Sequence, residues 1–273
     1  MCLCLLAALC SCGNESKEEV VDDIKTIQDR GVIRIGMECD YAPFNWMVTN
    51  PTDTSAKIQS GGYADGYDVY FSNMVGEALG VDVEVVKLEW SGLTLALDSG
   101  TIDLIIAGMS PTEERKVTVD FTDAYYTGEK VIIVRKDSKY ASATSIEEFS
   151  GAKLTGQLNS LMYDLIDQID GADKTQAYET TPEMIVAVNN GVVDGFVDDY
   201  DVAVSACNVN EDLVVVRFDE GKGFEVDESD TVNAIGCRKG SNLVDYINDL
   251  LADVSEEERS ELMQKALATQ PSA

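Results

Sequence analysis

The sequence predicts an α/β protein made of two units of similar design. In the first half, apolar strands and helices alternate in the order strand–helix–strand–helix–strand up to Ile106, which is typical of a parallel sheet. The second half repeats the sequence of a strand, a polar break and a helix. No low-complexity linker separates the halves, so we expect the joints between the two units to be short and ordered.

Length and composition limit the kinds of partner that we expect the protein to bind. The 273 residues suffice for one large domain or two modest ones, and 45% hydrophobic with 26% charged residues is ordinary for a globular protein. The net charge is -30, from 50 acidic and 20 basic residues, so we expect neither nucleic acid nor anionic lipid headgroups as partners. The acids are spread along the chain, which is typical of a solvated surface.

The residue types that are missing exclude several kinds of chemistry. The chain has no His, which removes His-based catalytic triads and His metal sites. It contains neither GxGxxG nor GxxxxGK[ST], so nothing supports nucleotide binding. We therefore expect no metal and no cofactor.

The elements of the first unit follow from apolar spacing and from glycines that end helices. The segment before Gly80, for example, carries apolar residues at helical spacing. We expect strands at residues 32–36, 81–88 and 102–107, helices at 67–79 and 93–97, and a surface excursion or hairpin at 50–66.

The second unit and the end of the chain follow from the same signals. Ser145 with Glu148, and Ser255 with Glu258, have the spacing of a capping box, and Pro182 suits the first turn of a helix. We expect strands at 130–135, 153–157, 177–179, 191–197, 213–218 and 231–237. We expect helices at 145–149, from 159–160 through 169, at 181–189, at 243–251 and at 255–267.

Residues 100–115 carry the strongest signal for a ligand. The buried strand 102–107 ends in Gly, Ser and Pro, and strand ends of open α/β sheets are where ligands bind. Thr112 can cap the helix that follows, and Arg115 lies about one turn along it. Free backbone N–H groups, the Ser110 hydroxyl and a guanidinium together suit a small carboxylate. The alternative is a strand–turn–helix with a surface arginine.

The N-terminal residues predict a lipoprotein signal. Residues 2–10 form an apolar run that is too short to span a bilayer but suits a signal peptide. The following Leu9-Cys10-Ser11-Cys12-Gly13 resembles a bacterial lipobox, which implies that Cys12 is the lipidated N-terminus of the mature chain. No Lys or Arg precedes the run, and a buried apolar element is the alternative. We expect residues 1–12 to be the signal and 13–31 a polar tether and lead-in.

Three cysteines remain beyond this segment: Cys39, Cys207 and Cys237. Their odd number and scattered spacing do not form a disulfide framework. A bridge between Cys207 and Cys237 stays open, and small buried side chains are the default expectation.

Several segments in a fixed order point to a family. They are R-I-G-M-E-C-D-Y-A-P-F, G-Y-D-V, A-L-D-S-G-T-I-D-L-I-I-A-G-M-S-P-T-E-E-R, V-D-F-T-D-A-Y-Y and D-G-F-V-D-D. In this order the chain resembles the amino-acid-binding lipoproteins of ABC importers, which are extracellular solute-binding proteins of the polar amino-acid type (family 3). The resemblance covers nearly the whole mature chain. It departs at Tyr70, where the family commonly carries an acid.

The resemblance implies a two-lobed periplasmic-binding-protein-like fold of type II. Each lobe is a central, mostly parallel sheet flanked by helices, and two crossing strands join the lobes. Lobe 1 would comprise residues 32–125 plus 233–273, lobe 2 residues 128–229, and the first crossing would fall at 124–129. The lobes would close over the ligand by a hinge motion.

The resemblance also implies a binding site for a zwitterion. Arg115 would pair with the ligand α-carboxylate, and Ser160 of lobe 2 would offer its hydroxyl and N–H to the same carboxylate. Ser110 and the Gly108 carbonyl would join the site from the loop before Arg115. Asp199 would accept the α-ammonium; the alternative is that it is a surface acid. Tyr41 and Trp90 would form aromatic walls around the ligand, and a core role is the alternative for Trp90. Gln157 and Asp198 would lie near the side chain of the ligand.

Two further positions bear on the ligand and on its binding loop. Glu38 lies where relatives that bind basic amino acids place an acid, and Asp198 could be a second acid, so we lean to lysine, arginine or ornithine. Gln157 would fit glutamine or another polar neutral ligand about as well. Asn159 stands where the family often has Gly, and Asn tolerates left-handed backbone angles.

The resulting functional hypothesis is a monomeric, lipid-anchored, extracytoplasmic binding protein, not an enzyme. It would deliver a free amino acid to an ABC permease and its ATPase. The first alternative is an enzyme on the same fold, a prephenate or arogenate dehydratase, in which Glu38 or Asp198 would be the catalytic carboxylate. The second is the sensor lobe of a larger receptor, which we disfavour because no membrane or signalling segment follows Leu267.

Overall fold

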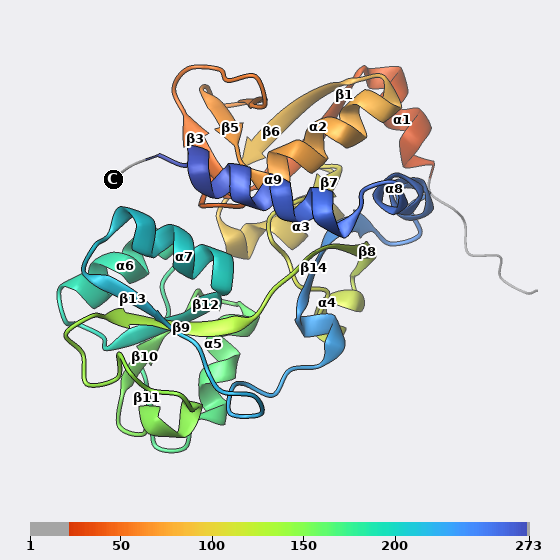
Figure 1. Cartoon of the computed structure of the whole chain (residues 1–273). Helices are drawn as coiled ribbons and strands as arrows, with labels where there is room; N and C mark the ends of the chain where they lie inside the picture. Colours follow the sequence, from red (N-terminus) through yellow and green to blue (C-terminus); the bar gives the residue numbers. More distant parts are fainter. Residues whose placement is uncertain (1–21, 272–273) are drawn as a thin grey trace, which may run out of the picture.

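The computed structural model describes residues 22–271, and their strands form two sheets (Figure 1). We call each sheet with the helices packed on it a lobe. Lobe 1 has the nine-stranded sheet β2-β3-β5-β4-β6-β1-β7-β14-β8, and lobe 2 has the five-stranded sheet β11-β10-β12-β9-β13. The predicted signal segment, Cys12 and the predicted tether up to residue 21 lie outside the described residues.

The strands of lobe 1 come from both ends of the described chain. They are β1 (Val32–Met37), β2 (Asp40–Tyr41), β3 (Asn45–Val48), β4 (Ala56–Ile58), β5 (Tyr63–Asp65), β6 (Asp82–Lys87), β7 (Leu104–Ile105), β8 (Val119–Thr127) and β14 (Val232–Arg238). The strands of lobe 2 are β9 (Lys130–Arg135), β10 (Lys153–Thr155), β11 (Asp173–Lys174), β12 (Gly195–Asp199) and β13 (Leu213–Val216).

Helices lie on both sheets and between them. The α-helices are α1 (Asp23–Arg30), α2 (Tyr67–Leu79), α3 (Leu93–Asp98), α4 (Glu113–Lys116), α5 (Leu161–Leu165), α6 (Thr181–Asn189), α7 (Tyr200–Val209), α8 (Leu243–Ala252) and α9 (Glu256–Thr269). Short 3-10 helices are η1 (Trp90–Gly92), η2 (Ile146–Phe149), η3 (Ile166–Gln168) and η4 (Glu228–Asp230).

Parallel pairs lie in the middle of the lobe 1 sheet and on one side of the lobe 2 sheet. In lobe 1, β1 pairs in parallel with β6 and β7, and in lobe 2, β10 pairs in parallel with β11 and β12. Antiparallel pairs lie outside them, because the chain turns back through hairpins and through the strands that connect the lobes. Both sheets are therefore mixed rather than mostly parallel as predicted, and the predicted parallel order holds at the centre of the lobe 1 sheet only.

Two segments cross between the lobes, side by side. The chain passes from β8 to β9 through Gly128 and returns through the segment that ends at β14 (Figure 1). The Gly128 N–H donates to the Thr231 carbonyl at 2.9 Å, and Val232 pairs with Thr127. This is the double connection that the resemblance predicts; the lobe boundaries stay a prediction.

The strand β9 divides the core of lobe 2 between the two faces of its sheet. Val131 and Ile133 pack with the cluster under α6, whereas Ile132 and Val134 pack with the cluster around Phe149. Side chains alternate along a strand, so an uninterrupted apolar run marks a strand that is buried on both faces. The sequence V-I-I-V has this property, which is why its limits were predictable.

Most predicted elements agree with the structure, and α2, β9 and α6 have the predicted limits. β7 is shorter than predicted. β12 begins four residues later than predicted, after the turn at Gly191. The predicted strand at 177–179 is reduced to an isolated bridge between Tyr178 and Gln157, and the edge strand β11 lies a few residues earlier. The predictions omit α1, β2, β3 and α7, although α1 is capped by Asp22 at its start and ends at Gly31.

The capping boxes differ at the two predicted places. Ser145 and Glu148 form the full reciprocal box at η2. At α9, Ser255 accepts from the Glu258 N–H, but the Glu258 side chain lies 3.4 Å from the Tyr70 hydroxyl, which donates to it. The second box is therefore only half formed.

Cys207 and Cys237 are free and lie in different lobes, so they do not form the bridge left open by the sequence. Cys237 is buried in the lobe 1 core, and Cys207 packs against a lobe 2 core. Within residues 22–271, no group of three or more candidate ligands could hold a metal ion. Over the same range, no helix has the length and hydrophobicity needed to cross a membrane.

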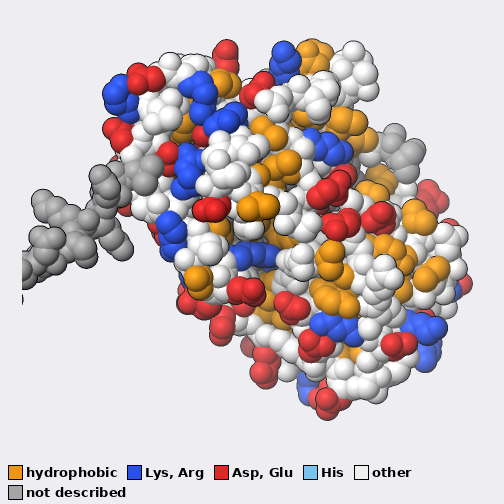
Figure 2. Space-filling view, turned by 180° about the vertical axis from the view of Figure 1, so that it is seen from behind, with side chains coloured by type: hydrophobic (Ala, Val, Ile, Leu, Met, Phe, Trp, Pro, Cys, Tyr) orange, Lys and Arg blue, Asp and Glu red, His pale blue; other side chains and the backbone are white. Residues whose placement is uncertain are grey.

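The surface has the mixed charge that the composition suggests. On the face shown in Figure 2, acidic and basic side chains are interspersed rather than gathered into one patch of a single sign. This agrees with the expectation that the excess acid mainly solvates the surface.

Candidate ligand-binding site

A glycine loop at the end of β7 forms the lobe 1 side of the site. Gly108 has φ +61°, and a Cβ there would lie 2.8 Å from Cε1 of Tyr41, so only glycine fits. Its N–H donates to the Tyr125 hydroxyl at 3.0 Å, and this hydroxyl donates to buried Asp68 at 2.6 Å. Burial raises the pKa of Asp68 to about 6. The G-Y-D-V motif therefore supports the binding loop from below.

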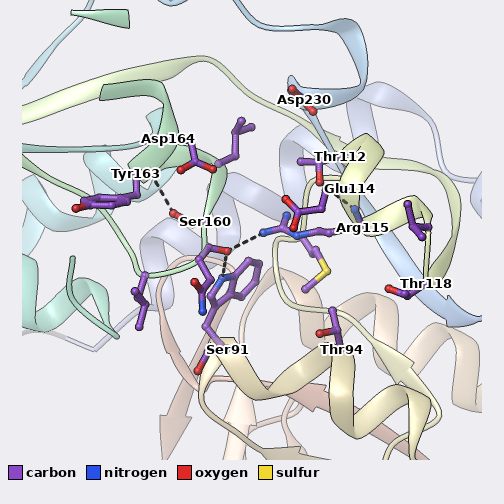
Figure 3. A pocket seen from close by; sticks show the side chains of 16 residues that line it. Ser91, Thr94, Thr112, Glu114, Arg115, Thr118, Ser160, Tyr163, Asp164 and Asp230 are labelled. Carbon is purple, nitrogen blue, oxygen red and sulfur yellow. Dashed lines mark hydrogen bonds between the residues drawn. The ribbon is translucent and has the colours of Figure 1, made fainter. Parts of the chain in front are cut away.

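Arg115 presents a guanidinium without a carboxylate partner. Thr112 caps α4 by accepting from the Arg115 N–H, as predicted. The guanidinium donates to the carbonyl of Asn159 at 3.2 Å (Figure 3) and to that of Ser110 at 2.9 Å, and it lies 5.0 Å from the centre of the Trp90 ring. It makes no ion pair with any residue of the described chain. Burial lowers its pKa to about 10, so it stays cationic at neutral pH.

The loop before α5 forms the lobe 2 side. Asn159 has φ +57°, the left-handed geometry expected at this position, and its carbonyl also accepts from Trp90 Nε1 at 3.1 Å. Ser160 caps α5 by accepting from the Tyr163 N–H. Its hydroxyl donates to the Gln157 carbonyl at 2.7 Å, so binding a carboxylate would exchange this local bond.

Most of the predicted site residues converge on one small cavity between the lobes. Its volume is about 20 Å³, enough for a water molecule but not for an amino acid. Its lining comprises Tyr41, Trp90, Gly108, Ser110, Arg115, Gln157, Ser160, Leu161 and Met162. A wider hollow of about 840 Å³ adjoins it, shares Arg115 and Trp90 with it, and is lined mainly by polar side chains (Figure 3). We place the site at the inner cavity because the predicted residues meet there.

Trp90 and Tyr41 lie between the lobe 1 core and the inner cavity, and their role as walls around a ligand stays a prediction. Both are buried in the lobe 1 core cluster, and both also line the inner cavity. Tyr41 stacks on Phe44 with ring centres 5.3 Å apart. The aromatic walls are thus held rigidly by the core behind them.

Carboxylates gather behind Tyr41 and Gln157, outside the cavity lining. We call Glu38, Asp40, Glu179 and Asp198 the acidic end of the site, and Arg115, Ser110 and Ser160 the carboxylate end. Glu38 Oε1 accepts from Gln157 Nε2 at 2.6 Å, and Asp198 Oδ1 accepts from the Tyr41 hydroxyl at 2.9 Å, both across the lobes.

The acidic end is buried at Glu38 and Asp198 but only half-buried at Asp40 and Glu179, and Asp40 Oδ2 pairs with Lys87 Nζ at 3.7 Å. The oxygens Glu38 Oε2, Asp40 Oδ1 and Glu179 Oε2 are buried without a hydrogen-bond partner. Burial, with the nearby Asp40 charge, raises the pKa of Glu38 well above its usual range. Burial and the neighbouring Asp199 raise the pKa of Asp198 to about 7. Such a group of oxygens suits a ligand that brings positive charge.

Asp199 is fully buried, so the alternative of a surface acid is wrong. Its Oδ1 accepts from Lys130 Nζ at 2.6 Å, and its Oδ2 has no partner. It lies outside the cavity lining but close to Tyr41, whose pKa its charge helps to raise.

Sequence reasoning missed three residues of the site. Lys130 opens an apolar strand, and only the antiparallel register of β9 and β12 places it opposite Asp199. Glu179 lies just before α6, and its carbonyl accepts from Gln157 Nε2 at 2.9 Å. Asn233 is fully buried in β14, and its amide is placed to donate to the Gly108 carbonyl at 3.2 Å. No local pattern marks any of the three.

Comparison with known proteins identifies the family. Residues 33–269 match the bacterial extracellular solute-binding proteins, family 3. The chain is 26% identical to the arginine-binding extracellular protein ArtP of Bacillus subtilis (strain 168) over 264 residues, which cover 96% of this chain and 93% of that protein. It is 27% identical to the ABC transporter glutamine-binding protein GlnH of the same strain, over 98% of this chain and 94% of that protein.

Comparison with solved structures identifies the fold. The structure of holo ArgBP from T. maritima matches with a TM-score of 0.71 and 27% identity, over 88% of this chain and 98% of that one. This confirms the predicted type II periplasmic-binding-protein fold. The named relatives are binding proteins rather than enzymes, which disfavours the dehydratase alternative. The chain belongs to the bacterial extracellular solute-binding proteins of family 3, as an amino-acid-binding protein of an ABC transporter.

Proposed function

We propose that this protein captures a free basic L-amino acid, with arginine preferred, and delivers it to an ABC permease. The acidic end of the site is the observation that supports a basic ligand. Three of its buried oxygens lack partners, on Glu38, Asp40 and Glu179. Asp40 pairs with Lys87 and Glu38 accepts from Gln157 through their other oxygens, but carboxylate oxygens left buried without a partner are costly, and the five donors of a guanidinium suit such a group.

The rest of the site suits the zwitterion that all amino acids share. Arg115, which has no ion pair within the described chain, would take the α-carboxylate with help from Ser110 and Ser160. The Gly108 carbonyl and Asp199 Oδ2 would accept from the α-ammonium. In this arrangement the carboxylate end recognises any amino acid, and the acidic end selects the side chain.

Glutamine is the weaker candidate ligand. A glutamine-binding relative and the presence of Gln157 both support glutamine as the ligand. However, Gln157 Nε2 already donates to Glu38 Oε1 and to the Glu179 carbonyl, so both of its amide hydrogens are engaged. This side chain supports the acidic end rather than offering donors to a neutral amide.

Capture would proceed by hinge closure of lobe 2 (residues 128–229) on lobe 1 (residues 32–125 plus 233–273). Hydrogen bonds already join the lobes from Tyr41 to Asp198 and from Gln157 to Glu38. An incoming cation would replace these donors on the two acids. Because the inner cavity holds only about 20 Å³, the lobes must separate to admit the ligand.

The protein would act as a monomer at the membrane surface, anchored by a lipid on Cys12, with the permease and its ATPase driving release. Replacing Cys12 by Ala should move the protein from the membrane fraction to the medium or the periplasm. Unchanged membrane retention of that variant would contradict the anchor.

A thermal-shift screen of the mature chain tests the ligand class. The panel should include the twenty amino acids, ornithine, cystine, prephenate and arogenate. A ligand at a hundred times its dissociation constant adds about 2.7 kcal/mol of stability, which is readily seen as a rise in the midpoint. We expect arginine, lysine or ornithine to give the largest shift. A largest shift with glutamine or another neutral amino acid would contradict the basic ligand while keeping the amino-acid site.

A further inference from the structure

Lys130 is the only Lys or Arg among residues 22–271 that is buried. It begins β9, and its side chain is 2% exposed against 0% for that of Asp199. Nζ of Lys130 lies 2.6 Å from Asp199 Oδ1, and this is its only ion pair within the described chain. Burying a lysine is costly, so a single buried lysine beside a site for a charged ligand calls for an explanation.

The ion pair with Lys130 determines which way the carboxylate of Asp199 points. Lys130 and Asp199 face each other in the antiparallel register of β9 and β12. Asp199 also occupies the N-cap position of the ten-residue helix α7, where an aspartate usually accepts from backbone N–H groups of the first turn. It makes no such cap bond. Its carboxylate instead turns to Lys130 and leaves Oδ2 buried without a partner.

This arrangement changes the charge balance where the ligand ammonium would bind. Without Lys130, only a ligand ammonium would compensate the buried carboxylate of Asp199, and a ligand without that group would leave it unpaired. With Lys130 in place, Asp199 keeps a cationic partner whether or not the ligand supplies one. Leaving a buried carboxylate unpaired costs more free energy than burying the lysine that pairs with it.

We propose that Lys130 is an internal counter-ion of Asp199 that lets the site accept carboxylate ligands lacking an α-ammonium. The additional ligands that the site would accept are ω-guanidino and ω-amino carboxylates. Arg115 would bind the carboxylate of such a ligand, and the acidic end would bind its cation. The inference rests on the proposed function for the placement of the ligand, and it makes Lys130 a determinant of specificity rather than of affinity alone.

The test compares each amino acid with its analogue that lacks the α-amino group. The two pairs are L-arginine with 5-guanidinopentanoate and L-glutamine with 5-amino-5-oxopentanoate, titrated by calorimetry into the full-length protein and into Lys130→Gln, Lys130→Met and the control Lys136→Gln. Lys136 follows β9 and is exposed. In the wild type we expect the analogue to bind no more than about tenfold more weakly than the amino acid. In both Lys130 variants this ratio should grow by a further factor of about ten or more, and in Lys136→Gln it should stay unchanged.

Each outcome decides the inference. A purely structural role for Lys130 would weaken both members of a pair equally and leave the ratio unchanged, which would overturn it. Rejection of both analogues by the wild type by about a thousandfold would also overturn it. If only the glutamine pair binds, the basic ligand is wrong, and that pair still tests Lys130. If neither pair binds, the inference fails, and the thermal-shift screen with lysine and ornithine decides the proposed function separately.

Discussion

The two ends of the site are built in different ways. The carboxylate end takes Ser110 and Arg115 from one short stretch of chain, where a glycine turn and a capped helix position both. The acidic end takes Glu38, Glu179 and Asp198 from three distant segments. In the proposed site, a local motif thus supplies the lobe 1 part of the carboxylate end, to which lobe 2 adds Ser160, whereas tertiary packing assembles the acidic end that would select the side chain. Substitutions at the two ends should therefore affect different ligands differently.

The largest effect should come from the carboxylate end. Arg115→Met removes the only guanidinium that lines the inner cavity and leaves the ligand carboxylate unpaired, which should cost about 3–5 kcal/mol in binding for every amino acid. Calorimetry with several ligands measures this loss. Lys116→Met, which removes a neighbouring charge from the same helix, should bind normally. Near-wild-type affinity in Arg115→Met would remove the assignment of the carboxylate end.

At the acidic end the effect should depend on the ligand. Glu38→Gln keeps the shape of the side chain but removes its charge, so basic amino acids should lose about 2–3 kcal/mol of binding free energy. Neutral amino acids should lose little or gain. The matched control is Glu89→Gln, since Glu89 is exposed although its charge acts on Glu38. Equal losses for basic and neutral ligands would mean that the acidic end does not select.

Binding of a basic ligand should depend on pH. The pKa of Asp198 is raised to about 7 and that of Glu38 is raised well above its usual range, so both hold protons more readily in the ligand-free protein than ordinary carboxyls do. A cation favours the ionised forms, so binding releases protons, and affinity should fall as pH drops from about 7 to about 5, by at most about 1.4 kcal/mol per pH unit for each proton.

The ligand-free protein should show the opposite trend in stability. A carboxyl whose pKa is raised by folding destabilises the folded state as pH rises from its unfolded value, about 4, to its folded value. Asp198 should therefore lower the free energy of unfolding between about pH 4 and pH 7, Glu38 should lower it in the same direction above about pH 4, and a basic ligand should offset the loss. Calorimetry in buffers of different ionisation enthalpy measures the released protons. Affinity for arginine that is flat across this range would contradict the raised pKa values.

The smallest effect should come from the left-handed residue of the lobe 2 loop. Asn159 contributes its backbone carbonyl, which accepts from Trp90 and Arg115, and its φ of +57° disfavours most side chains. Asn159→Ala should therefore cost about 1 kcal/mol of stability, and Asn159→Gly should cost less. Thermal unfolding compares the two variants. A larger loss in Asn159→Gly than in Asn159→Ala would show that the side chain matters instead.

The sequence predicts the fold well wherever a local pattern carries the information. Amphipathic spacing and a terminal glycine define α2, and an apolar run defines β9. The capping pattern places Arg115 correctly, and Asn159 has the backbone geometry inferred for it. These patterns depend only on neighbouring residues, so they can be recognised without knowledge of the tertiary structure.

The parts that sequence reasoning missed depend on contacts between distant residues. Lys130 and Asp199 are 69 positions apart and meet only through the register of two antiparallel strands. The hydrogen bond between Gln157 and Glu38 spans 119 positions and the gap between the lobes. In a chain with 50 acidic residues, no pattern distinguishes the few carboxylates that become buried from those on the surface.

Comparing L-arginine with L-citrulline tests the central claim most directly. The two ligands have nearly the same shape, but citrulline carries a neutral urea in place of the guanidinium. If the acidic end selects a cation, calorimetry on the wild-type protein at pH 8 should show arginine binding at least about a hundredfold more tightly, or about 2.7 kcal/mol. Equal affinities, or tighter binding of citrulline, would contradict a basic ligand and leave only the general amino-acid site.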